Sequence, residues 1–309
     1  MTSDICKELE DILGNQCVKQ NEPMKNHTTF RIGGPADIFV TPAESKTLAK
    51  AVALCERKAV PYYIIGNGSN LLVGDGGFRG VIFQIYKTLD QMDFQKMDDG
   101  RLKVKAGAGI MLVRLAKEVS SQGYTGFEFA TGIPGTLGGA VTMNAGAYGG
   151  EIRDSIVSVE AMDKNGRIFV LDKKELKLGY RTSVIQSEGY VVLSAEFVFK
   201  PGDLKAVQER VDELTEKRKS KQPLEYPSAG STFKRPEGYF AGKLIQDAGL
   251  KGFRVGDAMV SEKHSGFVIN VGEATAEDVR SLMEQVNLRV KEAYGVSLEP
   301  EVRMIGEFL

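Results

Sequence analysis

Length and charge set the first limits on this chain. With 309 residues, of which 42% are hydrophobic, it exceeds the roughly 100 to 200 residues of a typical domain, so we expect two or three domains with cores of their own. A formal net charge of -1 gives no electrostatic footprint for nucleic acid or for an anionic membrane surface.

The cysteines and histidines indicate the redox compartment and whether a metal site is expected. The three cysteines, Cys6, Cys17 and Cys55, fit reduced thiols better than a disulfide framework. The first residues lack the basic and apolar parts of a signal peptide, and no run approaches the ~20 apolar residues that span a bilayer. The two histidines and the cysteines show no zinc-ligand spacing, so we expect a cytoplasmic protein without a metal.

The N-terminal part predicts one β-α-β unit that ends in a glycine turn. We expect an amphipathic helix from Met1 to about Lys19 and a strand over Thr29–Val40. A helix should open at Thr41–Glu44, which has capping-box spacing and a proline at the first helical position. The strand Tyr62–Ile65 then runs into the turn Gly66–Asn70.

Neither early glycine turn is a dinucleotide fingerprint. Gly66 and Gly68 match the first two glycines of G-x-G-x-x-G, but Leu71 takes the third position and begins a strand where a helix is required. The turn Gly107–Gly109 does precede a predicted helix over 110–123, yet Leu112 again replaces the third glycine. No G-x-x-x-x-G-K-[ST] occurs, so a P-loop is excluded as well.

The segment Gly132–Glu151 is the richest in small residues. It holds seven glycines, three alanines and one proline, and few side chains that could form a core. Glycine lets a ligand approach main-chain N–H groups, and successive N–H groups can cradle a pyrophosphate. A glycine-rich surface loop is the simpler alternative. The second cluster, Gly66–Gly77, favours a ligand held between two non-Rossmann loops.

The rest of the chain alternates strands and helices up to a small C-terminal α+β part. We expect strands over 102–105, 156–163, 167–172, 190–199, 266–271 and 297–306, and helices over 204–219, 240–248 and from Thr275 to Tyr294, the last with a capping box to Asp278 and a stop at Gly295.

Taken singly, the charged and polar residues have simple explanations. Arg181 suits a solvated surface charge, and the run Lys217–Lys219 with Lys221 suits a helix end, where cations interact well with the dipole. Ser231 is not a triad serine, because no G-x-S-x-G surrounds it. His264 fits an ordinary loop histidine.

Six motifs in register give a more specific indication. GNGSN, GIPGTLGGAVTMNAGAYGGE, GYRTS, PSAGSTFKRP, GLKG and LEPEVRMIG together resemble the UDP-N-acetylenolpyruvoylglucosamine reductases, bacterial flavoenzymes that make UDP-N-acetylmuramate for peptidoglycan. The resemblance covers nearly the whole chain. It implies an α+β architecture with the FAD-binding fold of the vanillyl-alcohol-oxidase type, in two subdomains (1–85 and 86–202), and a substrate-binding domain (203–309).

The resemblance also implies the cofactors. FAD would be bound without a covalent link, since neither glycine loop contains a histidine, and NADPH would be the co-substrate. The residues implied to hold FAD are Gly66, Asn67, Gly68, Ser69, Asn70, Gly132, Pro134, Gly138, Gly139, Asn144 and Gly146. No nucleic-acid or membrane partner is expected, and the chain is expected to be a monomer.

The implied chemistry assigns a role to each remaining motif. NADPH reduces FAD, and flavin N5 passes the hydride to the vinyl carbon of the enolpyruvyl ether. By motif, Arg181 would stabilise the resulting enolate, Ser231 would deliver the proton, and Glu301 would complete the polarising set. The residues implied to contact the UDP-sugar are Tyr180, Lys221, Lys251, His264 and Arg303.

One departure concerns a loop before the predicted helix 204–219. Some members carry an inserted loop there with a substrate-contacting tyrosine, whereas here YVVLSAEFVFKPGD runs straight into the helix, as in the shorter class of the family. Two rival functions remain open at this point: an FAD-linked oxidase of the same fold, which would release peroxide, and a nucleotide-binding module without turnover.

Overall fold

The computed structural model describes residues 2–309 and divides into two compact units. The first comprises the residues up to 19 with 38–67 and 80–218, and the second comprises 20–37, 68–79 and 219–309. The chain therefore passes between the units several times. The expected division into parts 1–85, 86–202 and 203–309 stays a prediction.

The N-terminal part of the chain forms two helices and a small sheet. Helices α1 (Thr2–Leu13) and α2 (Ser45–Arg57) contact each other. The sheet has the strand order β1-β2-β5-β3, with β1 (Val18–Pro23), β2 (Pro35–Val40), β5 (Phe78–Gln84) and β3 (Tyr62–Ile65). Strands β3 and β5 are parallel, and the turn Gly66–Asn70 follows the carboxyl end of β3.

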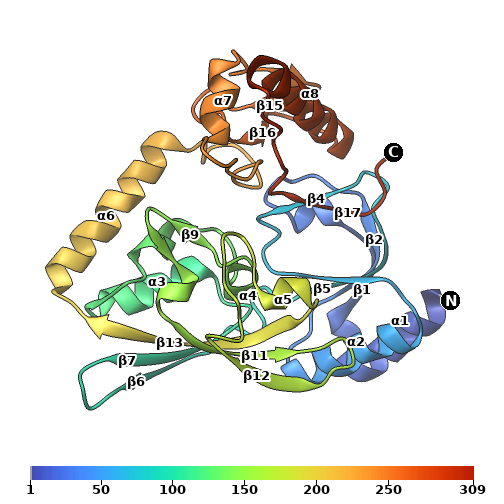
Figure 1. Cartoon of the computed structure of the whole chain (residues 1–309). Coiled ribbons are helices and arrows are strands. Elements are labelled where there is room, and N and C mark those ends of the chain that lie inside the picture. The colour runs from blue at the N-terminus through green and yellow to red at the C-terminus, as the bar shows by residue number, and fades with distance from the viewer. Residues whose placement is uncertain (1) are drawn as a thin grey trace. The chain divides into compact units, whose positions relative to one another are not determined.

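A larger antiparallel sheet completes the first unit (Figure 1). Its order is β12-β11-β13-β7-β6, with β8 also paired to β13; the bounds are β12 Ile168–Asp172, β11 Ile156–Met162, β13 Val191–Pro201, β7 Leu102–Gly107, β6 Met92–Lys96 and β8 Tyr124–Thr125. Phe127 packs between Phe129, Phe197 and Phe199, with ring centroids 5.2 to 5.4 Å away. This apolar core fixes the segments that carry the glycines.

Short elements connect this sheet to the glycine-rich segment. They are α3 (Leu112–Ser121), η3 (Glu128–Gly132), α4 (Leu137–Thr142), β9 (Gly146–Ala147), β10 (Gly150–Glu151), η4 (Ile152–Asp154) and α5 (Val184–Ser187). Helix α4 contacts β13 and β7. Only two residues separate the end of β13 at Pro201 from the start of α6 (Leu204–Lys221), so the connection has no room for an inserted loop, as expected.

The second unit is built around one long helix. Helices α7 (Ala241–Asp247) and α8 (Ala276–Tyr294) accompany the sheet β14-β15-β16, formed by Arg254–Val255, Ala258–Val260 and Val268–Asn270. Strand β17 (Arg303–Ile305) pairs in parallel with β4 (Leu71–Val73). The single-turn 3-10 helices η1 (Asn15–Cys17) and η2 (Met24–Asn26) flank β1 in the sequence. A second core, with Val279, Leu282 and Val286 of α8, holds it together.

Three N-terminal predictions are wrong in their bounds. The first helix ends at Leu13, because Gly14 takes φ 89°, which favours glycine and ends a helix. The strand expected over 29–40 begins only at Pro35. The next helix starts at Ser45 without the expected capping box at 41–44, and the N–H of Thr41 donates to Cys17 O (2.9 Å), which keeps that stretch extended.

The strand expected over 297–306 is limited to β17, Arg303–Ile305, because Leu298 N donates to Asn287 Oδ1 and Glu301 N donates to Thr232 O instead of to a neighbouring strand. Two other later predictions are confirmed. The strand Tyr62–Ile65 is present. α8 has the expected capping box: Asp278 N donates to Thr275 Oγ1 (3.0 Å) and Thr275 N donates to Asp278 Oδ2 (2.9 Å). Gly295 ends the helix in the left-handed conformation, φ 70°. Within residues 2–309, no helix has the length and apolar character of a membrane span, and no cluster of acidic, cysteine or histidine side chains could hold a metal.

Candidate active site

The turn Gly66–Asn70 presents main-chain donors. Gly68 has φ +61°, and a Cβ there would lie 2.1 Å from His27 O, so only glycine fits. Within residues 2–309, the N–H groups of Asn67, Gly68 and Ser69 donate to no acceptor. Consecutive N–H groups around a left-handed residue form an anion-binding concavity. The turn therefore has the character of a phosphate cradle.

The start of this turn lies directly against the glycine-rich segment Gly132–Glu151. Asn67 Nδ2 donates to Pro134 O (2.8 Å). A Cβ on Gly66 would lie 2.1 Å from Thr136 Oγ1, and Gln84 Nε2 donates to Gly66 O (3.2 Å). The two segments that the sequence singled out are thus brought together at these residues.

The glycines of the segment Gly132–Glu151 serve two purposes. Gly138 and Gly146 are needed for packing, because a Cβ would lie 3.1 Å from Ala108 Cβ and 2.8 Å from Glu151 Cβ, respectively. Gly139 differs: it is exposed, and the nearest atom to an added Cβ is 3.8 Å away. Space for a ligand against bare main chain therefore exists at Gly139.

Sequence reasoning missed Thr136. Its side chain is 2% exposed, and within residues 2–309 its hydroxyl has no hydrogen-bond partner. A buried hydroxyl without a partner costs about 1 to 3 kcal/mol and is commonly satisfied by an ion, a ligand or an ordered water. No sequence signal distinguished Thr136, because threonine is common before a helix.

Asn144 organises the segment from inside. It is 1% exposed and has φ 44°. Its Nδ2 donates to Glu151 Oε2 (2.8 Å) and to Gly179 O (3.0 Å), and its Oδ1 accepts from Arg153 N (3.0 Å). All its amide atoms are engaged within the protein, so Asn144 holds the Gly179 loop to the glycine-rich segment.

That loop presents Tyr180 and Arg181 at the tip of a tight turn. Gly179 and Thr182 exchange main-chain hydrogen bonds of 3.1 and 3.4 Å, and Ser183 Oγ donates to Thr142 O (2.6 Å). Arg181 has φ 54°, a conformation that costs of order 1 kcal/mol in a non-glycine residue and clusters at functional sites. Its guanidinium lies 5.3 Å from the centre of the Tyr180 ring, and Tyr180 is 57% exposed.

In the second unit, Ser231 and Glu301 belong to adjacent segments. Glu301 N donates to Thr232 O (2.8 Å). Thr232, 1% exposed, is fixed in turn because its Oγ1 accepts from Val268 N (2.9 Å). Ser231 is exposed and Glu301 is half-buried. The predicted proton donor and carboxyl are therefore neighbours along one main-chain ladder.

The turn Gly66–Asn70 joins this ladder through Asn70. Asn70 Nδ2 donates to Glu301 O (3.1 Å), and Asn70 O accepts from Arg303 N (3.0 Å). Arg303 is exposed on β17. Sequence reasoning assigned Asn70 to the cofactor alone and missed that its side chain anchors the main chain of Glu301.

Lys221 and Lys251 lie close enough to His264 for their charges to act on it. Burial lowers the pKa of His264 below its usual value, and the positive charges of Lys221 and Lys251 lower that pKa further. Nδ1 of His264 accepts from Gly266 N (3.1 Å), which requires an unprotonated Nδ1. The imidazole is therefore neutral at pH 7, and the two lysines provide the positive charge of this cluster.

Comparisons with known proteins first define a class and then a family. Residues 36–172 match the model of the FAD binding domain, which makes this a protein with a flavin-nucleotide-binding fold. Residues 222–305 match the C-terminal domain of UDP-N-acetylenolpyruvoylglucosamine reductase.

Full-length relatives bear the same name. The chain is 52% identical over 307 residues, 99% of both chains, to the UDP-N-acetylenolpyruvoylglucosamine reductase of Lachnoclostridium phytofermentans, and 53% identical over 304 residues to that of Clostridium novyi, covering 98% and 97%. The crystal structure of the Thermus caldophilus reductase has a TM-score of 0.78 at 36% identity, covering 91% of this chain and 97% of that one. The chain belongs to the UDP-N-acetylenolpyruvoylglucosamine reductase family, and the family and fold class expected from the motifs are confirmed.

Proposed function

We propose that this chain is an NADPH-driven reductase that uses non-covalently bound FAD to convert UDP-N-acetyl-3-O-(1-carboxyvinyl)-glucosamine to UDP-N-acetylmuramate, in peptidoglycan precursor synthesis. The observation that carries the proposal is the 52% identity to a reductase of this name over 99% of both chains. The chemistry that FAD supplies when bound is hydride transfer from NADPH to the vinyl carbon of the substrate.

The glycine segments fit a flavin diphosphate. The free N–H groups of Asn67, Gly68 and Ser69 would bind it, and the open space at Gly139 would let it approach the backbone. The other cofactor residues proposed from the sequence are Gly66, Asn70, Gly132, Pro134, Gly138, Asn144 and Gly146. Of these, Asn144 acts by shaping the segment, since its side-chain atoms are engaged elsewhere.

Arg181 is proposed to stabilise the enolate. Hydride addition to the vinyl carbon leaves negative charge next to the substrate carboxylate, so a cation fixed before the reaction lowers the barrier. The hydrogen bonds that hold the Gly179–Thr182 turn support this role, because a preorganised guanidinium need not reorient as charge develops. Tyr180, beside it, is proposed to contact the substrate.

Ser231 is proposed to protonate the adjacent carbon. A serine hydroxyl is a weak acid, so donation requires a strongly basic enolate in a site from which water is excluded. Glu301 would complete the polarising set. Its place beside Thr232 supports joint action, since the two side chains are carried by hydrogen-bonded segments.

The cluster of Lys221, Lys251 and His264 is proposed to bind the UDP diphosphate. Two ammonium groups near a neutral imidazole provide charge for the anion while the imidazole can donate a hydrogen bond. Arg303 is proposed as a further substrate contact.

The half-reactions test this function directly. Purified protein should show a flavin absorption spectrum that NADPH bleaches without air, and the enolpyruvyl substrate should restore the colour. Flavin that NADPH leaves oxidised would favour a nucleotide-binding module. Rapid reoxidation by oxygen with peroxide release, and none by the enolpyruvyl ether, would favour an oxidase.

We further propose a monomeric cytoplasmic protein without nucleic-acid or membrane partners. Cys6, Cys17 and Cys55 form no disulfide, which is consistent with a reducing compartment. Sedimentation at micromolar concentration should give the mass of one chain, and a dimer would contradict the proposal.

A further inference from the structure

The basic run at the end of α6 contains two kinds of residue. Lys217 is paired with Glu213, and Lys219 is exposed, as a solvated helix end predicts. Arg218 lies against the glycine-rich segment. A Cβ added to Gly132 would lie 2.6 Å from Arg218 Nη1 and 2.7 Å from its Cδ. The guanidinium therefore packs on the bare backbone where that segment begins.

The guanidinium of Arg218 is half-buried without an acceptor. Within residues 2–309 it makes no ion pair and no hydrogen bond. Burial lowers its pKa, opposed only by attraction to Tyr148. Arginine remains charged in proteins, and a charged group that leaves water normally has a partner. Arg218 is thus prepared for an anion that the protein itself does not supply.

Tyr148 marks the same place. It stands at the tip of the hairpin between β9 and β10, with φ 52° at Tyr148 and φ 89° at Gly149, as a two-residue hairpin turn requires. Its side chain is 42% exposed. Tyr148 lies close enough to the guanidinium of Arg218 to raise its pKa.

We infer that Arg218 is an anion receptor that binds a phosphate group of a nucleotide ligand beside Gly132, with Tyr148 at its edge. The planar fork of a guanidinium matches two phosphate oxygens, and the lack of a side chain at Gly132 lets that fork lie flat on the main chain. The choice of ligand rests on the proposed function, in which FAD, NADPH and the UDP-sugar each carry phosphates. FAD is the first candidate, because Gly132 and Tyr148 lie inside the matched FAD binding domain.

The helix dipole alone does not explain why the side chain of Arg218 is half-buried. Cations near a helix C-terminus gain from the dipole whichever way they point, so the dipole accounts for Lys217 and Lys219 equally well. It gives no reason for Arg218 to leave water while its neighbours stay in it. That difference within three consecutive cations separates a binding residue from a solvated helix end.

The experiment compares Arg218→Gln, Arg218→Lys and the matched control Lys219→Gln in the flavin-loaded protein. Three measurements distinguish the sources: FAD release on dilution, followed by flavin fluorescence; UDP binding, followed by perturbation of the flavin spectrum; and the ratio of kcat/KM for NADPH and NADH. We expect Arg218→Gln to weaken one of them about 10- to 100-fold. Arg218→Lys should recover only part, because an ammonium lacks the fork.

The outcomes are decisive in each direction. Weaker FAD retention assigns the diphosphate of FAD, weaker UDP binding assigns that of the sugar nucleotide, and loss of NADPH preference assigns the 2′-phosphate. All three values within twofold of wild type, an equal loss in Lys219→Gln, or a fall in all three with a lowered Tm would overturn the inference. If the wild-type protein holds neither FAD nor UDP, the proposed function fails separately, and calorimetry with inorganic pyrophosphate on wild type and Arg218→Gln then tests the receptor.

Discussion

The turns Gly66–Asn70 and Gly74–Gly77 lie on either side of strand β4, and both consist of glycine and small polar residues. In the first turn, three consecutive N–H groups have no acceptor within residues 2–309. In the second, Gly74 N donates to Ile305 O and Gly76 N donates to Glu307 O, both at 2.9 Å. The first turn is open to a ligand, whereas the second is closed by the chain's own C-terminal residues.

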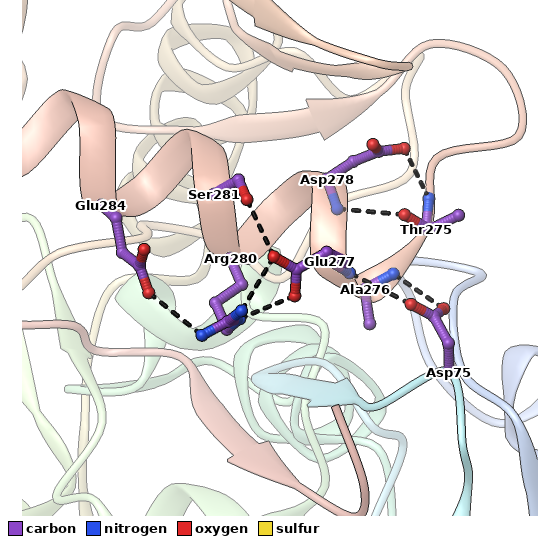
Figure 2. A network of polar contacts seen from close by, with 8 residues as sticks. All are labelled: Asp75, Thr275, Ala276, Glu277, Asp278, Arg280, Ser281 and Glu284. Atoms are coloured by element: carbon purple, nitrogen blue, oxygen red, sulfur yellow. Dashed lines mark hydrogen bonds and ion pairs between the residues drawn. The ribbon is translucent and has the colours of Figure 1, made fainter. Parts of the chain in front are cut away.

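Asp75 shows what the second turn does. Its carboxylate oxygens accept from Ala276 N (2.9 Å) and Glu277 N (3.1 Å), the first two N–H groups of α8 (Figure 2). These are helix donors that otherwise lack a partner. Glycine density therefore predicts a close approach to the backbone but not its partner, which can be a ligand or another part of the chain.

The largest expected effect lies on the ligand side of this comparison. Ser231→Ala should retain flavin reduction by NADPH and lose roughly 10²-fold or more in the reaction with the enolpyruvyl ether, because the enolate then lacks its proton donor. Stopped-flow absorbance measures both steps, and Ser228→Ala is the matched control. Normal turnover in Ser231→Ala would discard Ser231 as the donor.

On the structural side, Asp75→Ala should lower the free energy of unfolding by about 1 to 2 kcal/mol, because it removes a charged cap from α8. Rates per folded, flavin-loaded molecule should not change. Denaturant titration gives the stability, and Glu273→Ala removes an exposed carboxylate nearby as a control. A stable Asp75→Ala variant with impaired catalysis would contradict the contrast between the two turns.

Asn70 belongs to the turn that is open to a ligand, but its side chain has a structural role, because it donates to Glu301 O. Asn70→Ala should cost about 1 kcal/mol of stability, since the carbonyl of Glu301 loses a donor. We also expect a 3- to 10-fold slower second half-reaction at unchanged flavin reduction, roughly the rate equivalent of that energy. Asn70→Asp keeps the size of the side chain without the donor and should behave alike. A defect limited to FAD retention would assign Asn70 to the cofactor alone.

The smallest effect concerns His264. Its lowered pKa means that the folded protein resists protonation, so the free energy of unfolding should decrease as the pH falls below the ordinary imidazole value of about 6.5. UDP bound at Lys221 and Lys251 should raise this pKa. NMR titration can follow it easily, because His27 is the other histidine of the sequence, and His264→Gln assigns the signal. An unchanged pKa with bound UDP would place the diphosphate elsewhere.

The sequence was most informative where a local signal determines structure. The capping box of α8 needs only Thr275 and Asp278, and both bonds are present. Predictions that depend on distant partners were weaker. Segment 132–151 contains helix α4, whose Leu137 and Val141 are fully buried, because residues far along the chain cover these side chains.

The candidate site residues divide in the same way, into those that a local motif locates and those that depend on distant contacts. The motifs located Arg181, Ser231 and Glu301, and those roles stay predictions. Spacing could not reveal the unpaired guanidinium of Arg218, because its neighbours in sequence are also cations. Nor could it reveal that Asn70 bonds to the carbonyl of Glu301, since that contact depends on the pairing of β4 with β17.

The pairing of β4 with β17 has a consequence for biosynthesis. Asn70 and Glu301 are 231 positions apart, so a ribosome adding about 5 to 20 residues per second needs on the order of 10 to 50 s to supply the second partner after the first. During that interval β4 has no β17 to pair with, and the nascent turn Gly66–Asn70 lacks its anchor. The turn Gly66–Asn70 therefore gains this anchor only after Glu301 has been synthesised.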